Sequence, residues 1–364
     1  MNESLFNKGI LGKIEVSNRF GVAPMTRTSA TDEGLVTDRM ENYYSRYAEG
    51  KFGFIIVEGT YTDREYSQGY FNQPGITTGE QLNAWKKLVD TVHAKGSKII
   101  VQLMHAGAQA VGNPFIKETI APSEVKPKNI ETTPKEATKQ DLLEIKKYFV
   151  EAAKRAEVAG FDGVEIHGAN GYLLDEFLLD YANLRTDEYG GDTQKRVKYL
   201  TEIIEAVRES VANDFTVGIR ISQNNLMDQF SHQWANGEKD AEVIFSSLKE
   251  AGADFIHTTA YDAWKPAFGE NTLSLAAAAK KFGNLTVVAN GNMQEIDQAE
   301  EMIQKGEADF ITIGKMALAN PDLPLKVKRN EELIPFDPEK FMVVTEQNAM
   351  PDMTIKDHEV NMMK

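Results

Sequence analysis

The feature that most constrains the fold of this 364-residue chain is a regular alternation of short apolar segments with amphipathic helical patterns. Each apolar segment has the length and composition of a buried strand. Helix-length segments between consecutive strands make the strands parallel, and eight such units can close into a barrel. The eight predicted strands are residues 20–23, 54–57, 98–103, 163–166, 216–221, 255–257, 285–289 and 310–313.

Two of the intervening helical patterns can be placed at residue level. In residues 139–159 apolar side chains recur at intervals of three and four, Thr138 can cap the first turn, and Gly160 can end the helix. Residues 194–211 carry a similar apolar stripe. The sequence therefore predicts a (β/α)8 TIM barrel over residues 1–330, with long loops on its carboxyl face.

Two points of the architecture stay open at this level. A doubly wound open sheet is the main alternative, disfavoured by the count of eight units and by the lack of a Gly-x-Gly-x-x-Gly run after any predicted strand. The tail, residues 331–364, shows little periodicity. It is either frayed or docked on a neighbouring subunit.

Composition narrows the possible partners and cofactors. Forty Lys and Arg against 55 Asp and Glu give a formal net charge of −15, which disfavours nucleic acid and anionic membranes as partners. The chain has no cysteine, which excludes disulfides, thiolate-bound metals and iron–sulfur clusters. No His-x-His or His-Glu-x-x-His pattern occurs, so no metal site is predicted. Without a leader or a long apolar run, we expect a soluble cytoplasmic protein.

Polar residues follow the fourth predicted strand, where the carboxyl ends of barrel strands form the face at which barrel enzymes act. His167 and Asn170 can aim two donors at one ligand oxygen, and Tyr172 can deliver a proton. We predict that these three residues are catalytic. Asp175 and Glu176 follow on a helical pattern, where we expect them to be solvated or to act as caps.

The ends of the last two predicted strands indicate an anion site. Gly291, Asn292 and Gly314 permit close approach of the backbone to a phosphate, and Lys315 adds a positive charge. Deeper in the predicted mouth, a glutamine and an arginine could pair with a ring edge and stabilise negative charge on that ring. The set suits a phosphorylated planar cofactor such as a flavin. The two ring-facing residues are Gln102 and Arg220.

Six segments, taken in order, resemble the NADH:flavin oxidoreductase / Old Yellow Enzyme family. The resemblance covers about residues 5–328, and the run from His-Gly-Ala-Asn-Gly-Tyr to Tyr-Gly-Gly is its most specific part. The segments are Asn18-Arg-Phe with Ala23-Pro-Met-Thr26, then residues 57–60, 101–107, 167–178, 183–191 and 314–322.

The resemblance implies an FMN-binding barrel that uses NADH or NADPH to reduce activated C=C bonds, with enones, quinones or nitro compounds as substrates. His167 and Asn170 would bind the substrate oxygen, Tyr172 would be the proton donor, and Thr26 would tune the flavin potential. The expected partners are a small-molecule substrate and further copies of the chain in a homo-oligomer. The residues that would contact FMN are Pro24, Met25, Thr26, Gly59, Gln102, Arg220, Gly291, Asn292, Gly314 and Lys315.

The sequence departs from the family pattern in three places. Lys315 stands where arginine is usual, Thr28 stands where one branch has a tyrosine, and the absence of cysteine separates the chain from longer relatives with an iron–sulfur cluster. Two other functions remain open. One is a flavin barrel of dihydroorotate-dehydrogenase-like specificity, which would need a Ser or Cys base over the flavin. The other is a non-catalytic flavin-binding protein.

Overall fold

A closed barrel of eight parallel strands forms the centre of the protein in a computed structural model, which describes residues 3–115, 118–128, 130–224, 232–338, 343–344 and 351–352. The pairing of β12 with β3 closes the ring. The predicted (β/α)8 fold is confirmed, and each predicted strand begins within one residue of the observed one. The barrel strands are β3 (Phe20–Val22), β4 (Phe54–Tyr61), β5 (Lys98–Met104), β8 (Gly163–Gly168), β9 (Thr216–Ser222), β10 (Phe255–Thr259), β11 (Thr286–Asn290) and β12 (Phe310–Ile313).

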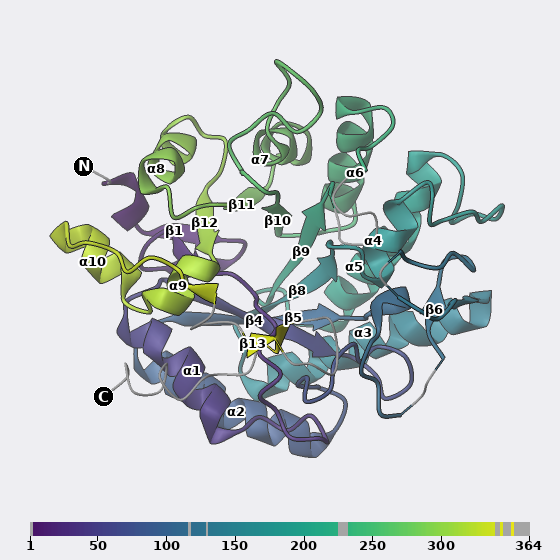
Figure 1. Ribbon diagram of the computed structural model, residues 1–364, viewed down its shortest axis with the longest axis horizontal. Helices are drawn as coiled ribbons and strands as arrows, with labels where there is room; N and C mark the ends of the chain where they lie inside the picture. Colours follow the sequence, from purple (N-terminus) through teal and green to yellow (C-terminus); the bar gives the residue numbers. More distant parts are fainter. Residues whose placement is uncertain are drawn as a thin grey trace.

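Helices surround this barrel (Figure 1). The predicted helix after residue 138 is confirmed as α3, where Thr138 and Asp141 form a capping box and Gly160 ends the helix with a φ of 91°. The second predicted helix is confirmed as α5, which is capped by Asp192. The helices are α1 (Asp38–Glu49), α2 (Gly79–Ala94), α3 (Lys139–Ala159), α4 (Leu173–Leu178), α5 (Thr193–Ser210), α6 (Glu238–Glu250), α7 (Leu275–Ala278), α8 (Ile296–Gln304), α9 (Lys315–Ala319) and α10 (Leu323–Arg329).

An antiparallel hairpin of β1 (Gly9–Leu11) and β2 (Ile14–Val16) closes the amino-terminal end of the barrel. Its apolar side chains belong to one buried cluster with residues at or near the starts of the barrel strands. Apolar side chains therefore fill the barrel interior at this end, which leaves the carboxyl face for a ligand. The cluster comprises Leu11, Ile14, Val16, Phe54, Ile56, Ile100, Phe255, Val288 and Phe310.

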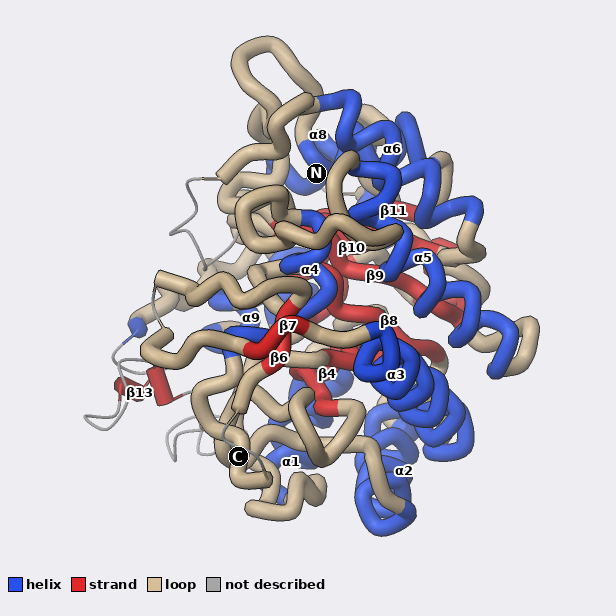
Figure 2. Tube along the Cα trace, turned by 90° about the vertical axis from the view of Figure 1, so that its right-hand side faces the viewer, coloured by secondary structure: helices blue, strands red, loops and turns tan. Residues whose placement is uncertain are grey.

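The long connections gather at the opposite end of the barrel. Figure 2 shows these loops on one side of the molecule, with β6 (Ile120–Ala121) and β7 (Lys135–Glu136) among them. Part of the second predicted long connection, residues 225–231, lies outside the described residues, as does most of the tail. Within the tail the structure describes the short pair β13 (Val343–Val344) and β14 (Pro351–Asp352). The two alternatives for the tail, frayed or docked on a neighbour, both stay open, and the homo-oligomer stays a prediction.

Across the residues that the structure describes, none of the helices has both the length and the apolar character needed to cross a membrane.

Glycines inside the barrel make room for aromatic rings. Adding a single methyl group at such a glycine should therefore lower the free energy of unfolding. A Cβ on Gly218 would lie 2.1 Å from the ring of Phe255. We expect Gly218→Ala to lower the free energy of unfolding by about 1–3 kcal/mol through overpacking, measured by urea unfolding. Gly79→Ala is the control, because a Cβ there meets nothing within 4 Å. Equal stability of wild type and Gly218→Ala would contradict this packing.

Candidate active site at the barrel mouth

The turn after β8 places the three predicted catalytic residues together. Asn170 and Gly171 adopt left-handed backbone conformations with φ of 62° and 80°, which Asn and Gly tolerate best. The N–H of Asn170 donates to Oγ of Ser222 at 2.8 Å. The turn returns Tyr172 over the end of β8, so that its ring centroid lies 5.2 Å from that of His167. The predicted trio thus shares one end of one strand.

His167 is buried and electrically neutral at ordinary pH. Burial, followed by the positive field of Arg220 and the proximity of His257, lowers its pKa well below the usual value. Among the described residues, Nδ1 of His167 and Nε of Arg220 have no hydrogen-bond partner, although Nη2 of Arg220 donates to Oδ1 of Asn290 at 2.8 Å. Unpartnered buried polar atoms are costly, so this part of the mouth is suited to a polar ligand.

Tyr172 keeps its proton. Burial, and then the neighbouring hydroxyl of Tyr70, raise its pKa well above the usual value of a tyrosine. The hydroxyls of Tyr70 and Tyr172 form a short hydrogen bond. Tyr70, in the loop after β4, was not predicted as a site residue. Its only signal in the sequence is its position after a barrel strand.

The predicted phosphate-binding residues lie at the ends of β11 and β12. Gly291 and Asn292 have φ of 137° and 50°, so the backbone turns sharply here; the predicted approach of a phosphate to it stays a prediction. The Asn292 side-chain amide donates to Oδ1 of Asp262 at 2.5 Å, and the Asn292 carbonyl accepts the N–H of Glu295. A Cβ on Gly314 would lie 3.7 Å from Sδ of Met25, so the loops after β3 and β12 are neighbours.

The remaining predicted flavin contacts lie around the same rim. Pro24, Met25 and Thr26 are half-buried after β3, and Lys315 is exposed at the start of α9. A Cβ on Gly59 would lie 3.4 Å from Oε1 of Gln102, so these two predicted residues are also neighbours. Side chains that are far apart in the sequence thus come from seven barrel strands to one end of the barrel. Their roles remain predictions.

Asp175 and Glu176 correct one expectation. Both side chains are fully buried, so they are not solvated. Asp175 accepts the N–H of Gly171 at 2.7 Å and Glu176 accepts the N–H of Ala108 at 2.9 Å, and burial raises the pKa of Glu176 well above its usual value. They hold the loops after β5 and β8 together beneath the mouth.

Glu58 is a second buried carboxyl that the sequence did not single out. It lies in β4, accepts the N–H of Arg27 at 2.8 Å and of Thr28 at 3.3 Å, and accepts the hydroxyl of Tyr44 at 3.0 Å. Burial raises its pKa to about 7. Glu58 therefore anchors the backbone directly after Thr26.

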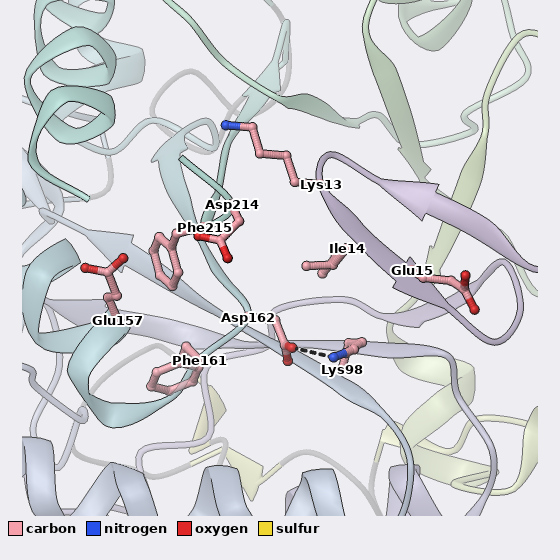
Figure 3. Close-up of a pocket in the computed structure, with 9 residues that line it drawn as sticks. All are labelled: Lys13, Ile14, Glu15, Lys98, Glu157, Phe161, Asp162, Asp214 and Phe215. Atoms are coloured by element: carbon pink, nitrogen blue, oxygen red, sulfur yellow. Dashed lines mark hydrogen bonds and ion pairs between the residues drawn. The ribbon is translucent and has the colours of Figure 1, made fainter. Parts of the chain in front are cut away.

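A separate cavity of about 490 Å³ lies at the other end of the barrel, between the β1–β2 hairpin and the starts of the barrel strands. Figure 3 shows its lining, including the ion pair between Lys98 and Asp162, whose charged atoms are 2.8 Å apart. None of the predicted site residues lines it. The mouth and this cavity are distinct places on the fold.

The predicted site residues thus lie at the carboxyl face of a parallel barrel, which is the face where barrel enzymes act. Residues 4–333 match the NADH:flavin oxidoreductase / NADH oxidase family, and the chain belongs to that family. The family is FMN-dependent and uses NAD(P)H, which agrees with the cofactors expected from the sequence.

Individual relatives agree with this assignment. The chain is 33% identical to an NADH oxidase of Thermoanaerobacter brockii over 90% of its own residues, and spans 51% of that protein. It is 31% identical to the Chanoclavine-I aldehyde reductase fgaOx3 of Penicillium roqueforti, over 96% of this chain and 95% of the relative. It thus spans about half the length of the first relative and nearly all of the second.

A solved structure shares both fold and sequence. The old yellow enzyme homologue from Zymomonas mobilis superposes with a TM-score of 0.83 and 29% identity, over 92% of this chain and 95% of that one. The resemblance to the Old Yellow Enzyme family is confirmed.

Titration of Glu58 predicts a pH-dependent stability. The folded protein keeps a proton on Glu58 up to about pH 7, whereas the usual carboxyl value is 4.5. In this window the folded state binds more protons than the unfolded chain, so this contribution to stability falls as pH rises. Glu58→Gln should remove this pH-dependent contribution. The free energy of unfolding of the wild type, relative to that of Glu58→Gln, should therefore fall by on the order of 3 kcal/mol between pH 4.5 and 8.

Urea unfolding at several pH values measures this difference. Glu205→Gln is the matched control, because Glu205 is exposed on α5, and it should leave the wild-type pH profile unchanged. Parallel profiles for wild type and Glu58→Gln would show that the proton on Glu58 does not contribute.

Proposed function

We propose that the chain is an FMN-dependent NAD(P)H oxidoreductase that reduces activated C=C bonds of small molecules such as enones and quinones. The observation that carries this proposal is the pairing at the barrel mouth of His167, whose Nδ1 is unpartnered among the described residues, with Tyr172, whose phenol burial keeps protonated. Family membership supports the same chemistry.

The residues around the rim would hold the cofactor. The backbone at Gly291, Asn292 and Gly314 would bind the FMN phosphate, and Lys315 would add a point charge there without the two-pronged geometry of an arginine. Gln102 and Arg220 would face the ring, together with the segment 24–26 and Gly59. Bound FMN supplies the hydride after NADH or NADPH has reduced it.

His167 and Asn170 would bind the oxygen that activates the alkene. A neutral imidazole and a carboxamide each have an N–H to donate, and these donors stabilise the negative charge that develops on the substrate oxygen. The effect is strong because the site is buried and its donors are fixed before the reaction. Hydride transfer to the β-carbon thereby becomes easier.

Tyr172 would complete the reduction by giving its proton to the α-carbon. The raised pKa keeps the phenol in the donor form throughout the physiological range. The hydrogen bond with Tyr70 restricts where the phenol can point.

The proposal as a whole predicts a yellow protein that consumes NADH when 2-cyclohexenone or a quinone is added. The visible spectrum of purified protein and the absorbance of NADH with and without substrate measure the two properties. FMN binding without turnover of any enone, quinone or nitro compound would favour a non-catalytic flavin protein. A protein that stays colourless after incubation with FMN would refute both.

Tyr172→Phe should slow alkene reduction by about 100-fold or more, since general acids contribute at least that much, while reduction of the flavin by NADH keeps its rate. Stopped-flow measurement of the two half-reactions separates these effects. Tyr199→Phe is the matched control, because it removes a buried hydroxyl that donates to the carbonyl of Leu142 away from the mouth. Equal slowing of both half-reactions would remove Tyr172 from the role of proton donor.

A further inference from the structure

A line of buried hydrogen bonds crosses the barrel just beneath the mouth. Nε2 of Gln102 donates to Oε1 of Glu165 at 2.8 Å, Nδ1 of His257 lies 2.7 Å from Oε2 of Glu165, and Nε2 of His257 lies 2.8 Å from Oγ1 of Thr312. The four residues come from β5, β8, β10 and β12, and none is more than 3% exposed. We call them the polar layer.

The polar layer lies between an apolar base and the ligand-facing mouth. Phe255 and Phe310, two residues before His257 and Thr312 on their strands, belong to the apolar cluster that fills the base. On its other side Arg220 is near enough to interact electrostatically with Glu165 and His257. A carboxylate and an imidazole are costly to bury, so their presence here calls for a role that apolar side chains could not fill.

The chemistry of Glu165 fixes the direction of each hydrogen bond. A carboxylate only accepts hydrogen bonds, so the NH2 group of Gln102, and not its carbonyl, must face Oε1. Nδ1 of His257 must likewise donate to Oε2. Burial lowers the pKa of His257, so its Nε2 is free of a proton and accepts the hydroxyl hydrogen of Thr312. Every bond thus has one possible direction.

The carbonyl oxygen of Gln102 consequently faces away from Glu165. It lies toward Gly59, whose added Cβ would be 3.4 Å away, and among the residues that the structure describes none donates a hydrogen bond to it. An oxidised flavin ring carries a single N–H, at N3, between two carbonyl groups. An acceptor held in a constant direction suits that N–H, whereas a flipped amide would present a donor to it.

We propose that Glu165, held by His257 and Thr312, is a positioning residue that locks the amide of Gln102 with its oxygen toward the flavin N3–H. The inference rests on the proposed function, because it requires FMN to be the ligand of the mouth. It assigns a purpose to three buried polar residues that touch neither the substrate nor the cofactor. Their effect on the hydrogen bond to the flavin N3–H passes through Gln102.

A double-mutant cycle on FMN affinity tests this coupling. Glu165→Gln has the shape of Glu165 but offers both a donor and an acceptor, so the direction of the Gln102 amide is no longer fixed. We expect this variant and Gln102→Ala each to raise the FMN Kd by about tenfold, the value of one hydrogen bond. The double variant should bind FMN no more weakly than Gln102→Ala. Fluorescence titration of the apoproteins measures each Kd.

A flavin analogue gives a second readout that a merely structural role would not change. Wild type should bind 3-methyl-FMN, which lacks the N3–H, about tenfold more weakly than FMN, again the value of one hydrogen bond. Glu165→Gln and Gln102→Ala should discriminate less between the two. Thr258→Val is the control, because Thr258 lies next to His257 on β10 and donates to the carbonyl of Val288. Thr258→Val should alter thermal stability without altering the ratio of the Kd for 3-methyl-FMN to the Kd for FMN.

The outcomes separate this inference from the proposed function. If the wild type binds FMN but the losses of affinity in Glu165→Gln and Gln102→Ala add up in the double variant, the inference is overturned and the proposed function is not. A wild-type protein without affinity for FMN would overturn both. If Glu165→Gln does not fold, as circular dichroism of the apoprotein would show, Glu165→Asp replaces it, since the shortened carboxylate cannot reach both partners. An unchanged FMN Kd in Glu165→Asp would then overturn the inference.

Discussion

Closure of the barrel by the pairing of β12 with β3 is the constraint on which the rest of the structure depends. It brings the carboxyl ends of eight parallel strands to one rim, so residues from Pro24 to Lys315 can surround one ligand. The hairpin and the apolar cluster fill the opposite end. Because backbone pairing between strands forms the rim, each strand needs to contribute only one or two polar side chains to the ligand site.

The barrel interior changes in polarity along its axis, and this change organises the electrostatics of the mouth. Phenylalanine rings fill the base, the polar layer follows, and Arg220 with His167 lies above it. The positive charge of Arg220 and burial act together on His167, so the imidazole remains neutral. The carboxyl group of Glu165 balances the guanidinium across the same interior. The donors at the mouth are thus fixed in protonation state before any ligand arrives.

The strands and the clustering of His167, Asn170 and Tyr172 at one strand end were predictable because their signals are local. Apolar runs mark the strands, and His167, Asn170 and Tyr172 follow one strand within six positions. The polar layer was not predictable, since Glu165 and His257 are 92 positions apart and nothing local in the sequence shows that their side chains meet. No role was predicted for Glu58. Asp175 and Glu176 were expected to be solvated or to act as caps because helical charged residues usually do one or the other. Both are buried; Asp175 accepts the N–H of Gly171, just before its helix, and Glu176 accepts an N–H from the loop after β5.

The pairing that closes the ring also determines when during synthesis the barrel can close. β3 emerges from the ribosome almost first, yet its partner β12 is among the last strands to be made. Until then β3 exposes an unpaired strand edge, and such edges favour association between chains. Ser4 and Leu5 likewise bind Glu300, on α8 near the other end of the chain. The barrel can therefore close only after β12 has been made, and contacts this distant in the sequence form slowly.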